Sequence, residues 1–463
     1  MKTITTLVAF FMCIILWGQS PSIEVHGGEV EIPRNTQPCI TEEQYEVIFN
    51  EIDLNISQLK REGRYIAPNR QGGHPLFTFP VAQEENDTFE YNSPFGYSNY
   101  VDHNFDFPNQ VQDFNCGSRT YDTTGGYNHD GYDIFTWPFW WQQMDRNQTI
   151  NIAGADGQIV FKLDGLFDMN CAFSDDQANA IVLEHFDGSR SVYLHFKEGT
   201  LTDKEVGDTV EEGEYLGVIG SSGSSTGPHL HFGVFDNNNE LIDPSIGTCN
   251  DLNEDTWWQD PIDYFNPGIN AVLTHTEFPQ FNSCPQLEDT FESNQFDSGE
   301  EVTWAVYLTD QLANTALELR TIRPDGSIQF DWEFDLTDQF QLSWWAWQFP
   351  TDMDGTWTWE VTYLGETVTH NFEVGVLGIE DQLLNDLKLY PNPTSGAFKL
   401  DFTQPFSNTI VTVTNLLGQT VSKRELFNEQ SILLNVEGAP GLYFVEVNQL
   451  EKGLSRTFKV IKN

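Results

Sequence analysis

The sequence is short of positive charge, since 463 residues contain 22 Lys and Arg against 70 Asp and Glu, a formal net charge of −48. A surface of this sign repels phosphate backbones and anionic lipid, so we expect no nucleic acid among the partners. The shortage is uneven: residues 377–463 hold 8 basic and 9 acidic residues, which leaves 14 and 61 in residues 1–376. We therefore predict that the C-terminal stretch is a separate unit.

Long apolar runs are also missing, because no segment beyond the N-terminus approaches 18 consecutive apolar residues. We expect no transmembrane segment in the mature chain. The one apolar stretch, Leu7 to Trp17, follows the basic Lys2 and precedes small or polar residues at 18–20. This order is typical of a signal peptide, so residues 1–19 are predicted to direct export and the protein to be secreted.

Cysteines are few and widely spaced: Cys39, Cys116, Cys171, Cys249 and Cys284 remain after the predicted signal peptide. The absence of any CxxC pair argues against a structural zinc knuckle or a thioredoxin-type site. Most cysteines of an exported protein are expected to form disulfides. We expect Cys116 to pair with Cys171 and Cys249 with Cys284, with one thiol left over, although spacing alone leaves the connectivity open.

What is abundant is the pattern of a folded, mostly β protein, with 39% hydrophobic and 14% aromatic residues. A capping-box-like start at Thr41 and helically spaced apolar residues predict one helix over residues 41–62. Short β-rich runs between turn residues predict an antiparallel sheet from Pro75 to Phe235, and alternating runs over 284–376 predict a small β-sandwich. The tryptophans of the sandwich would fill its core or stack on sugar rings; they are Trp344, Trp345, Trp347, Trp357 and Trp359.

Three short segments carry histidine and aspartate in patterns suited to a metal ion. His129 and Asp133 lie four apart around Gly131, and His229 and His231 lie two apart, which places both on one side of a strand. A catalytic zinc wants three protein ligands and an open fourth position. His129, Asp133 and one histidine of the HxH pair supply that number, which leaves the other histidine for proton transfer.

A third histidine, His195, ends the segment YLH at 193–195. The order HxGxD, YxH and STGPHLHF within about 100 residues resembles the lysostaphin-type zinc endopeptidases, the peptidoglycan-cleaving family that includes LytM. The resemblance covers about residues 77–234 and includes the run of residues 205–220 and the segment of residues 116–119 before the first motif. It implies one Zn²⁺ per chain, the metal ligands His129, Asp133 and His231, and the catalytic pair His195 and His229.

The sequence departs from that family after the first motif. Residues 135–141 add Trp137, Trp140 and Trp141, which would form cleft walls or core, and an insertion near residues 167–171 lengthens a loop. The shape of the groove is therefore left open.

The last unit carries the opening motif LYPNPTSG at 389–396, the segment GLYFV at 441–445 and a short basic end. This order closely resembles the C-terminal sorting domain of the Bacteroidetes type IX secretion system. It implies that the secretion machinery is a partner, and it implies nothing about catalysis.

The resulting expectation is a mostly β chain with an antiparallel-sheet, lysostaphin-type peptidase domain followed by two small β-sandwich (immunoglobulin-like) domains. The expected division is a signal peptide (1–19), an N-terminal extension or propeptide with a helix (20–75), the zinc endopeptidase domain (76–250), a linker (251–283), the Trp-rich sandwich (284–376) and the sorting domain (377–463).

We favour a secreted monomeric zinc metallo-endopeptidase that hydrolyses peptide bonds in bacterial peptidoglycan, in the stem peptide or the cross-bridge. A second hypothesis keeps the chemistry and changes the substrate to Gly-rich proteins such as elastin-like matrix. A third is a catalytically inactive module that binds glycan through the Trp-rich sandwich.

Overall fold

The structure is a computed structural model that describes residues 24–32, 37–69, 72–84, 89, 91–261, 263–282, 284–375, 387–406, 409–426, 429–436, 438–449 and 454–463. The predicted signal peptide lies outside these residues. The chain forms two compact units, and each is described by itself: residues 374–463 with the short stretches 296–300 and 352–354 make the second, and the remainder makes the first.

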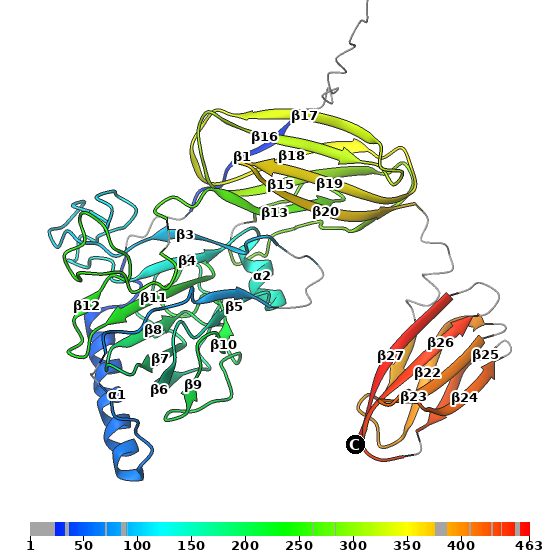
Figure 1. The fold of residues 1–463 in the computed structure, drawn as a ribbon, viewed down its shortest axis with the longest axis horizontal. Coiled ribbons are helices and arrows are strands. Elements are labelled where there is room, and N and C mark those ends of the chain that lie inside the picture. Colours follow the sequence, from blue (N-terminus) through cyan, green and yellow to red (C-terminus); the bar gives the residue numbers. More distant parts are fainter. Residues whose placement is uncertain are drawn as a thin grey trace, which may run out of the picture. The chain divides into compact units, whose positions relative to one another are not determined.

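The first unit is built on an antiparallel sheet (Figure 1). Its order is β3 (Phe95–Asn99), β4 (Tyr132–Thr136), β11 (His229–Phe235), β8 (Arg190–Leu194), β7 (Ala180–Glu184), β6 (Gly157–Leu163) and β9 (Thr209–Val210), with β12 (Leu241–Ile242) paired to β11. Strand β11 is central because it pairs with both β4 and β8. The antiparallel sheet expected between Pro75 and Phe235 is confirmed.

The two faces of this sheet pack against different partners. Leu230 and Phe232 of β11 join the larger core, beneath a second sheet formed by β10 (Tyr215–Val218), β5 (Thr149–Ile152) and β2 (Val81–Gln83). Phe235 of the same strand belongs to a separate cluster with residues 39–56. Because side chains alternate along a strand, the opposite face also carries His229 and His231.

The opposite face is covered by helix α1 (Glu42–Glu62), which confirms the helix predicted from the sequence. Thr41 caps it through the expected capping box with Gln44, and Gly63 ends it in the left-handed conformation. The buried positions recur at helical spacing and are Tyr45, Ile48, Ile52, Ile56 and Leu59.

A β-sandwich completes the first unit, as the alternating runs over 284–376 predicted. One sheet has the order β1 (His26–Glu29), β18 (Phe340–Pro350), β15 (Glu301–Gln311) and β13 (Gly268–His275). The other has the order β14 (Gln295–Phe296), β20 (Glu366–Val374), β19 (Gly355–Tyr363), β16 (Thr315–Ile322) and β17 (Ile328–Leu336). Two of these strands come from outside 284–376, since β1 belongs to the N-terminal extension and β13 to the segment expected as a linker.

The tryptophans of the sandwich are mainly core residues. Trp347, Trp357 and Trp359 are buried, and their rings pack on one another and on neighbouring aromatics. Trp344 and Trp345 are only partly buried. The core interpretation therefore holds for three of the five.

The sandwich and the sheet around β11 are linked by polar contacts. The buried guanidinium of Arg119 forms a bidentate ion pair with Asp310 of β15, at 2.7 and 3.1 Å. Gln341 of β18 donates to the Tyr97 carbonyl of β3 at 2.7 Å. Bidentate guanidinium–carboxylate pairs fix orientation as well as position.

The expected disulfide pairing is wrong. Cys116 is bonded to Cys249 and Cys171 to Cys284, while Cys39 is free and buried. The loop that carries Cys171 folds towards the segment leading into the sandwich, a contact that sequence spacing does not record. The leftover thiol was expected, and it is Cys39.

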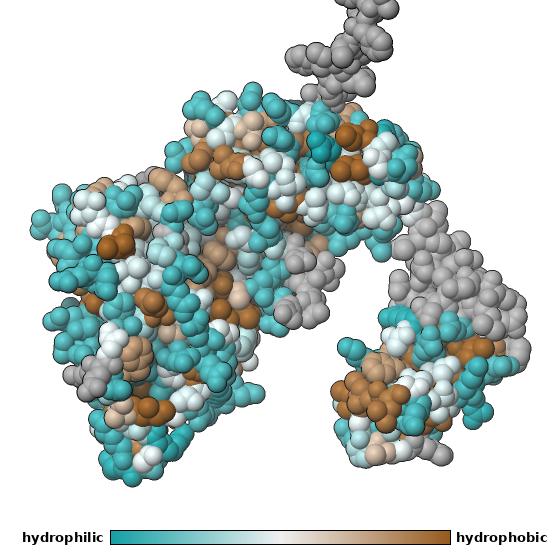
Figure 2. Space-filling view, viewed as in Figure 1, coloured by the Kyte–Doolittle hydropathy of each residue, from teal (hydrophilic) through white to brown (hydrophobic). Residues whose placement is uncertain are grey.

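The second unit is another β-sandwich. Its sheets are β21 (Lys388–Tyr390), β22 (Ala397–Phe406) and β25 (Glu429–Asn435), and β24 (Thr420–Leu426), β23 (Thr409–Asn415), β26 (Gly441–Gln449) and β27 (Leu454–Lys462). The visible face of the first unit is largely hydrophilic (Figure 2), as expected of its many acidic residues. None of the helices within the described residues is long and apolar enough to cross a membrane.

Helix α1 gives a matched pair of stability variants. Ile52 is fully buried against the sheet, whereas Leu54 is 70% exposed. We expect Ile52→Ala to lower the free energy of unfolding by about 2–5 kcal/mol, the usual cost of truncating a buried aliphatic side chain. Leu54→Ala should change it by no more than about 0.5 kcal/mol. Urea unfolding followed by tryptophan fluorescence measures both, and equal effects would contradict the docking of α1.

Candidate metal centre

The five predicted site residues come together on one face of the central sheet. In the register of β11, His231 lies opposite Asp133 of β4 on one side and Leu194 of β8 on the other. Cross-strand partners project to the same face, so the Asp133 carboxylate and the His231 ring meet. His229 lies two residues before His231, and His195 follows the last residue of β8.

Gly131 explains why the first motif has a glycine between its histidine and its aspartate. A Cβ atom at this position would lie 2.6 Å from His231 Nε2 and 2.9 Å from the Phe232 carbonyl oxygen. Only a residue without a side chain lets the His129–Asp133 segment pass so close to β11. The glycine is therefore a packing requirement of the site.

Three side chains bring donor atoms to one point. Asp133 Oδ1 lies 3.1 Å from His129 Nε2 and 3.1 Å from His231 Nδ1. All three residues are buried. Ligand atoms at about 2.0–2.2 Å from a tetrahedral zinc lie roughly 3–4 Å from one another, so these separations suit a small ion.

The remaining ring nitrogens have partners that orient the rings. His129 Nδ1 donates to the Tyr100 carbonyl oxygen at 2.7 Å, which leaves the lone pair of Nε2 towards Asp133. His231 is turned the other way, with Nε2 3.4 Å from Asp130 Oδ1 and Nδ1 towards Asp133. Such outer contacts are the usual means of fixing metal-binding histidines.

The Asp133 carboxylate is held by amide and imidazole groups. Asn99 Nδ2 donates to Asp133 Oδ2 at 3.1 Å. Burial by itself raises the pKa of Asp133, but the charge and hydrogen bonds of His129 and His231 outweigh it and hold that pKa well below its ordinary value. Asp133 is thus an ionised carboxylate in a buried site, which calls for nearby positive charge.

His195 and His229 form a second pair beside this cluster, with ring centroids 4.4 Å apart. His195 Nδ1 donates to the Ser222 carbonyl oxygen at 2.7 Å and His229 Nδ1 to the Gly227 carbonyl oxygen at 2.8 Å. Each Nε2 is buried without a hydrogen-bond partner among the described residues. Burial, with the neighbouring His195, lowers the pKa of His229 to about 4, so its Nε2 can accept a proton at neutral pH.

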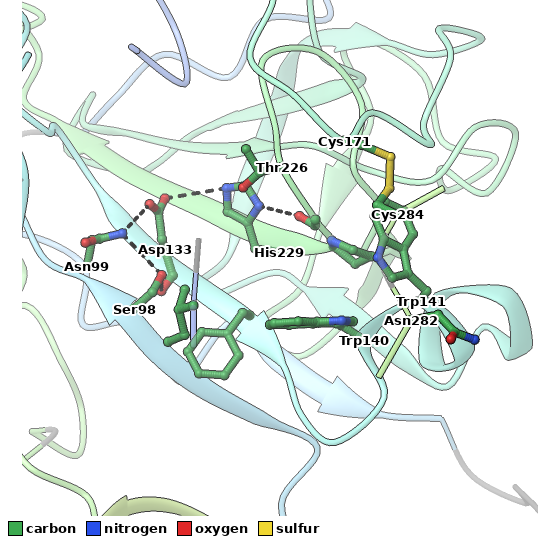
Figure 3. Close-up of a pocket in the computed structure, with 14 residues that line it drawn as sticks. Ser98, Asn99, Asp133, Trp140, Trp141, Cys171, Thr226, His229, Asn282 and Cys284 are labelled. Carbon is green, nitrogen blue, oxygen red and sulfur yellow. Dashed lines mark hydrogen bonds and ion pairs between the residues drawn. A yellow bond between two sulfur atoms is a disulfide. The ribbon is translucent and has the colours of Figure 1, made fainter. Parts of the chain in front are cut away.

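A pocket of about 370 Å³ opens beside this site, and Figure 3 shows Asp133 and His229 in its wall. The partly exposed Trp140 and the buried Trp141 of helix α2 (Trp140–Arg146) form another part of the wall. The Cys171–Cys284 disulfide lies beside them. The sequence left undecided whether Trp137, Trp140 and Trp141 form the cleft wall or the core. Trp137 is fully buried and belongs to the core.

Sequence reasoning missed one residue of this site. The Cys39 thiol lies 3.3 Å from His231 Nδ1 and 3.1 Å from the Tyr127 hydroxyl. Cys39, His129 and His231 offer ligand atoms that all lie within 4.8 Å of one another. The only signal in the sequence was that the number of cysteines after the signal peptide is odd.

The donor set fits a metal ion. It combines two imidazole nitrogens with a carboxylate, and the Nε2 of His129 has no hydrogen-bond partner among the described residues. Imidazole and carboxylate ligands of this kind are typical of zinc. The His129, Asp133 and His231 side chains would hold the ion.

The chain matches two protein families. Residues 143–244 match Peptidase family M23, and residues 388–463 match the Secretion system C-terminal sorting domain. The chain therefore carries an M23 (LytM-type) peptidase domain, from a family of metallopeptidases, and a type IX secretion sorting domain that marks it as a secreted protein. The M23 match includes His195, His229 and His231 but begins after Asp133, so the pairing of β4 with β11 is what joins the first motif to the matched region.

Curated relatives match a short part of the chain. A DD-carboxypeptidase/endopeptidase Mpg from Neisseria meningitidis is 34% identical over 80 residues, which cover 17% of this chain and 16% of the relative. A protein from Buchnera aphidicola named as an uncharacterized metalloprotease is 32% identical over 90 residues, 19% of this chain and 23% of the relative. The chain thus spans about a sixth to a quarter of the length of these curated relatives.

Among solved structures, one described as a peptidase M23 from Pseudomonas aeruginosa has a TM-score of 0.21 and 20% identity, covering 40% of this chain and 56% of that chain. A two-domain fibronectin type-III segment of chicken tenascin has a TM-score of 0.15 and 11% identity, covering 36% and 95%.

The bond from Asn99 to Asp133 gives a test of the outer contacts. We expect Asn99→Ala to weaken metal binding roughly 10- to 100-fold, the usual effect of removing an outer-sphere partner. Asn238→Ala is the matched control, because the Asn238 amide also donates to an aspartate, Asp236, but does so in an exposed turn after β11. Competition with a chromogenic chelator measures both affinities, and equal values for the two variants would contradict this role of Asn99.

Proposed function

We propose that the protein is a secreted zinc metallo-endopeptidase that hydrolyses peptide bonds in bacterial peptidoglycan, in the stem peptide or the cross-bridge. The observation that carries the proposal is the meeting of His129, Asp133 and His231 donor atoms beside the His195–His229 pair. The M23 match over residues 143–244 supports a peptidase, and the names of the Neisseria relatives support a peptidoglycan substrate.

The residue roles follow from which atoms are engaged. His129 Nε2, Asp133 Oδ1 and His231 Nδ1 would hold the ion, because the other polar atoms of these side chains are used by Tyr100, Asn99 and Asp130. A zinc ion held there would polarise the scissile carbonyl and lower the pKa of a water. That chemistry leaves proton transfer and charge stabilisation to the protein.

His229 is placed to act as the general base. Its side chain is 14% exposed and lines the pocket, whereas His195 is fully buried behind it. The bond from His229 Nδ1 to the Gly227 carbonyl aims Nε2 away from the loop and towards the Asp133 side of the pocket. His195, whose ring centroid lies 4.4 Å away, is the second group of the pair, and it stabilises negative charge on the substrate in the form that carries a proton on Nε2 as well as on Nδ1.

The pocket supports a peptide as substrate. It adjoins the proposed metal ligands on one side and the aromatic wall of Trp140 and Trp141 on the other. An aromatic wall binds the apolar parts of a peptide and excludes water from the reacting bond. The segment from residues 76 to 250 would form the endopeptidase domain, and the sorting domain would serve export.

Purified peptidoglycan sacculi provide the direct test of the function. We expect the zinc-loaded protein to release fragments with new amino termini, and a chelator to abolish that release, with mass spectrometry identifying the bond. A parallel digest of a Gly-rich protein such as elastin tests the second substrate. Cleavage of the protein alone would overturn the peptidoglycan assignment while leaving the zinc peptidase in place.

Two histidine variants separate metal binding from proton transfer. His231→Ala should abolish both zinc binding and activity. His229→Ala should keep one zinc per chain and lower kcat by about a hundredfold or more, the usual scale of general base catalysis. His74→Ala is the control, because His74 stacks on Trp257 outside the site. Zinc content and turnover measure the set, and normal turnover of His231→Ala would refute the ligand assignment.

A further inference from the structure

The N-terminal segment before α1 enters the metal centre. Among the described residues Cys39 is the unpaired cysteine, and it is 3% exposed. Its sulfur lies 3.3 Å from His231 Nδ1, the nitrogen that also faces Asp133. It belongs to a group with His129 and His231 whose ligand atoms all lie within 4.8 Å.

Cys39 is held in this place from both sides. Ser224 Oγ donates to the carbonyl oxygen of Pro38 at 2.7 Å, which ties the preceding residue to the loop before β11. Two residues after Cys39, Thr41 begins α1 with its capping box, and Ile40 packs in the cluster beneath the helix. The sulfur therefore has a defined position that depends on α1 being docked.

A second observation points to a ligand at this position. His129 Nε2 is buried without a hydrogen-bond partner among the described residues and lies in the same group as the sulfur. Many free cysteines are buried because their side chain packs as a small hydrophobic group. Such packing does not explain a thiol placed beside donor atoms of two histidines and near a carboxylate, where a thiolate is a strong zinc ligand.

We propose that Cys39 is the fourth ligand of the metal centre and keeps the secreted chain latent. This inference rests on the proposed zinc peptidase function and adds its regulation. Three protein ligands with one open position define a catalytic zinc site, and four protein ligands define a closed one. The Cys39 thiol loses its proton to solvent when it binds the ion, as metal-binding thiols do, and the sulfur fills the open position.

The same segment also covers the substrate side. Its strand β1 pairs with β18, and Ile32 lines the pocket that contains His229. Ile32 thus lies in the wall of the pocket while Cys39 lies against the metal ligands. Activation would then consist of displacing Cys39, and with it the chain before α1, from the metal ligands.

Zinc X-ray absorption on the full chain tests the ligand directly. We expect one sulfur neighbour at about 2.3 Å from the zinc. Cys39→Ser should lose this neighbour and keep one zinc per chain. Gln37→Ala is the matched control: Gln37 is exposed on the same segment, and the variant should keep the sulfur. The proposal is overturned if the zinc of the full chain has no sulfur neighbour. The metal site itself still stands in that case if the zinc is lost in His231→Ala.

Activity on sacculi gives the second readout. If sulfur blocks the zinc in nine tenths of the molecules, Cys39→Ser raises turnover roughly tenfold, because activity scales with the competent fraction. Ser224→Ala, which removes the bond to Pro38, should raise turnover by less. Equal turnover of Cys39→Ser and the unaltered chain overturns latency. If the zinc has a sulfur neighbour but no variant hydrolyses sacculi, Cys39 remains a zinc ligand and the proposed peptidoglycan peptidase function is overturned.

Discussion

A buried carboxylate in the middle of a sheet is the constraint on which this protein depends. Asp133 is ionised on β4 and is surrounded by the imidazoles of His129, His229 and His231 at 3.1–3.7 Å. Such a charge is costly to bury unless it is compensated. Compensation requires β4 beside β11 in one register, because a slip of one residue would turn every side chain of the strand to the other face. The core on the far face, with Leu230 and Phe232, fixes that register.

Much of this site could be predicted from the sequence because most of its residues lie on or beside strands, where the spacing of two residues decides which face a side chain takes. The spacing of His229 and His231 placed them on one face, and the spacing of His129 and Asp133 around Gly131 suited one ion. The close approach of Gly131 to β11 became visible only in the structure. Helix α1 was readable for the same reason, through its cap and its period. Not every apolar residue of the helix is buried, since Leu54 points to solvent while Ile56 is buried.

What the sequence did not predict depends on contacts between distant segments. Cys39 is 192 residues from the histidine that it touches, and the disulfides close loops of 133 and 113 residues in a pairing that spacing did not indicate. Helix α2 carried no local signal, because Phe139 precedes it in the left-handed conformation without a side-chain cap. Local pattern records propensity and period, and these features arise from tertiary packing.

The antiparallel pairing of β1 with β18 has a consequence for the processed protein. Strand β1 forms the outer edge of its sheet, so β18 has β15 on one side and only the N-terminal segment on the other. Loss of that segment would leave without partners the backbone N–H and C=O groups that residues 343–346 of β18 turn towards β1. Exposed strand edges recruit further strands. Activation of the metal centre and the creation of an adhesive sheet edge would therefore be one event, which couples hydrolysis to attachment at the site where the segment is removed.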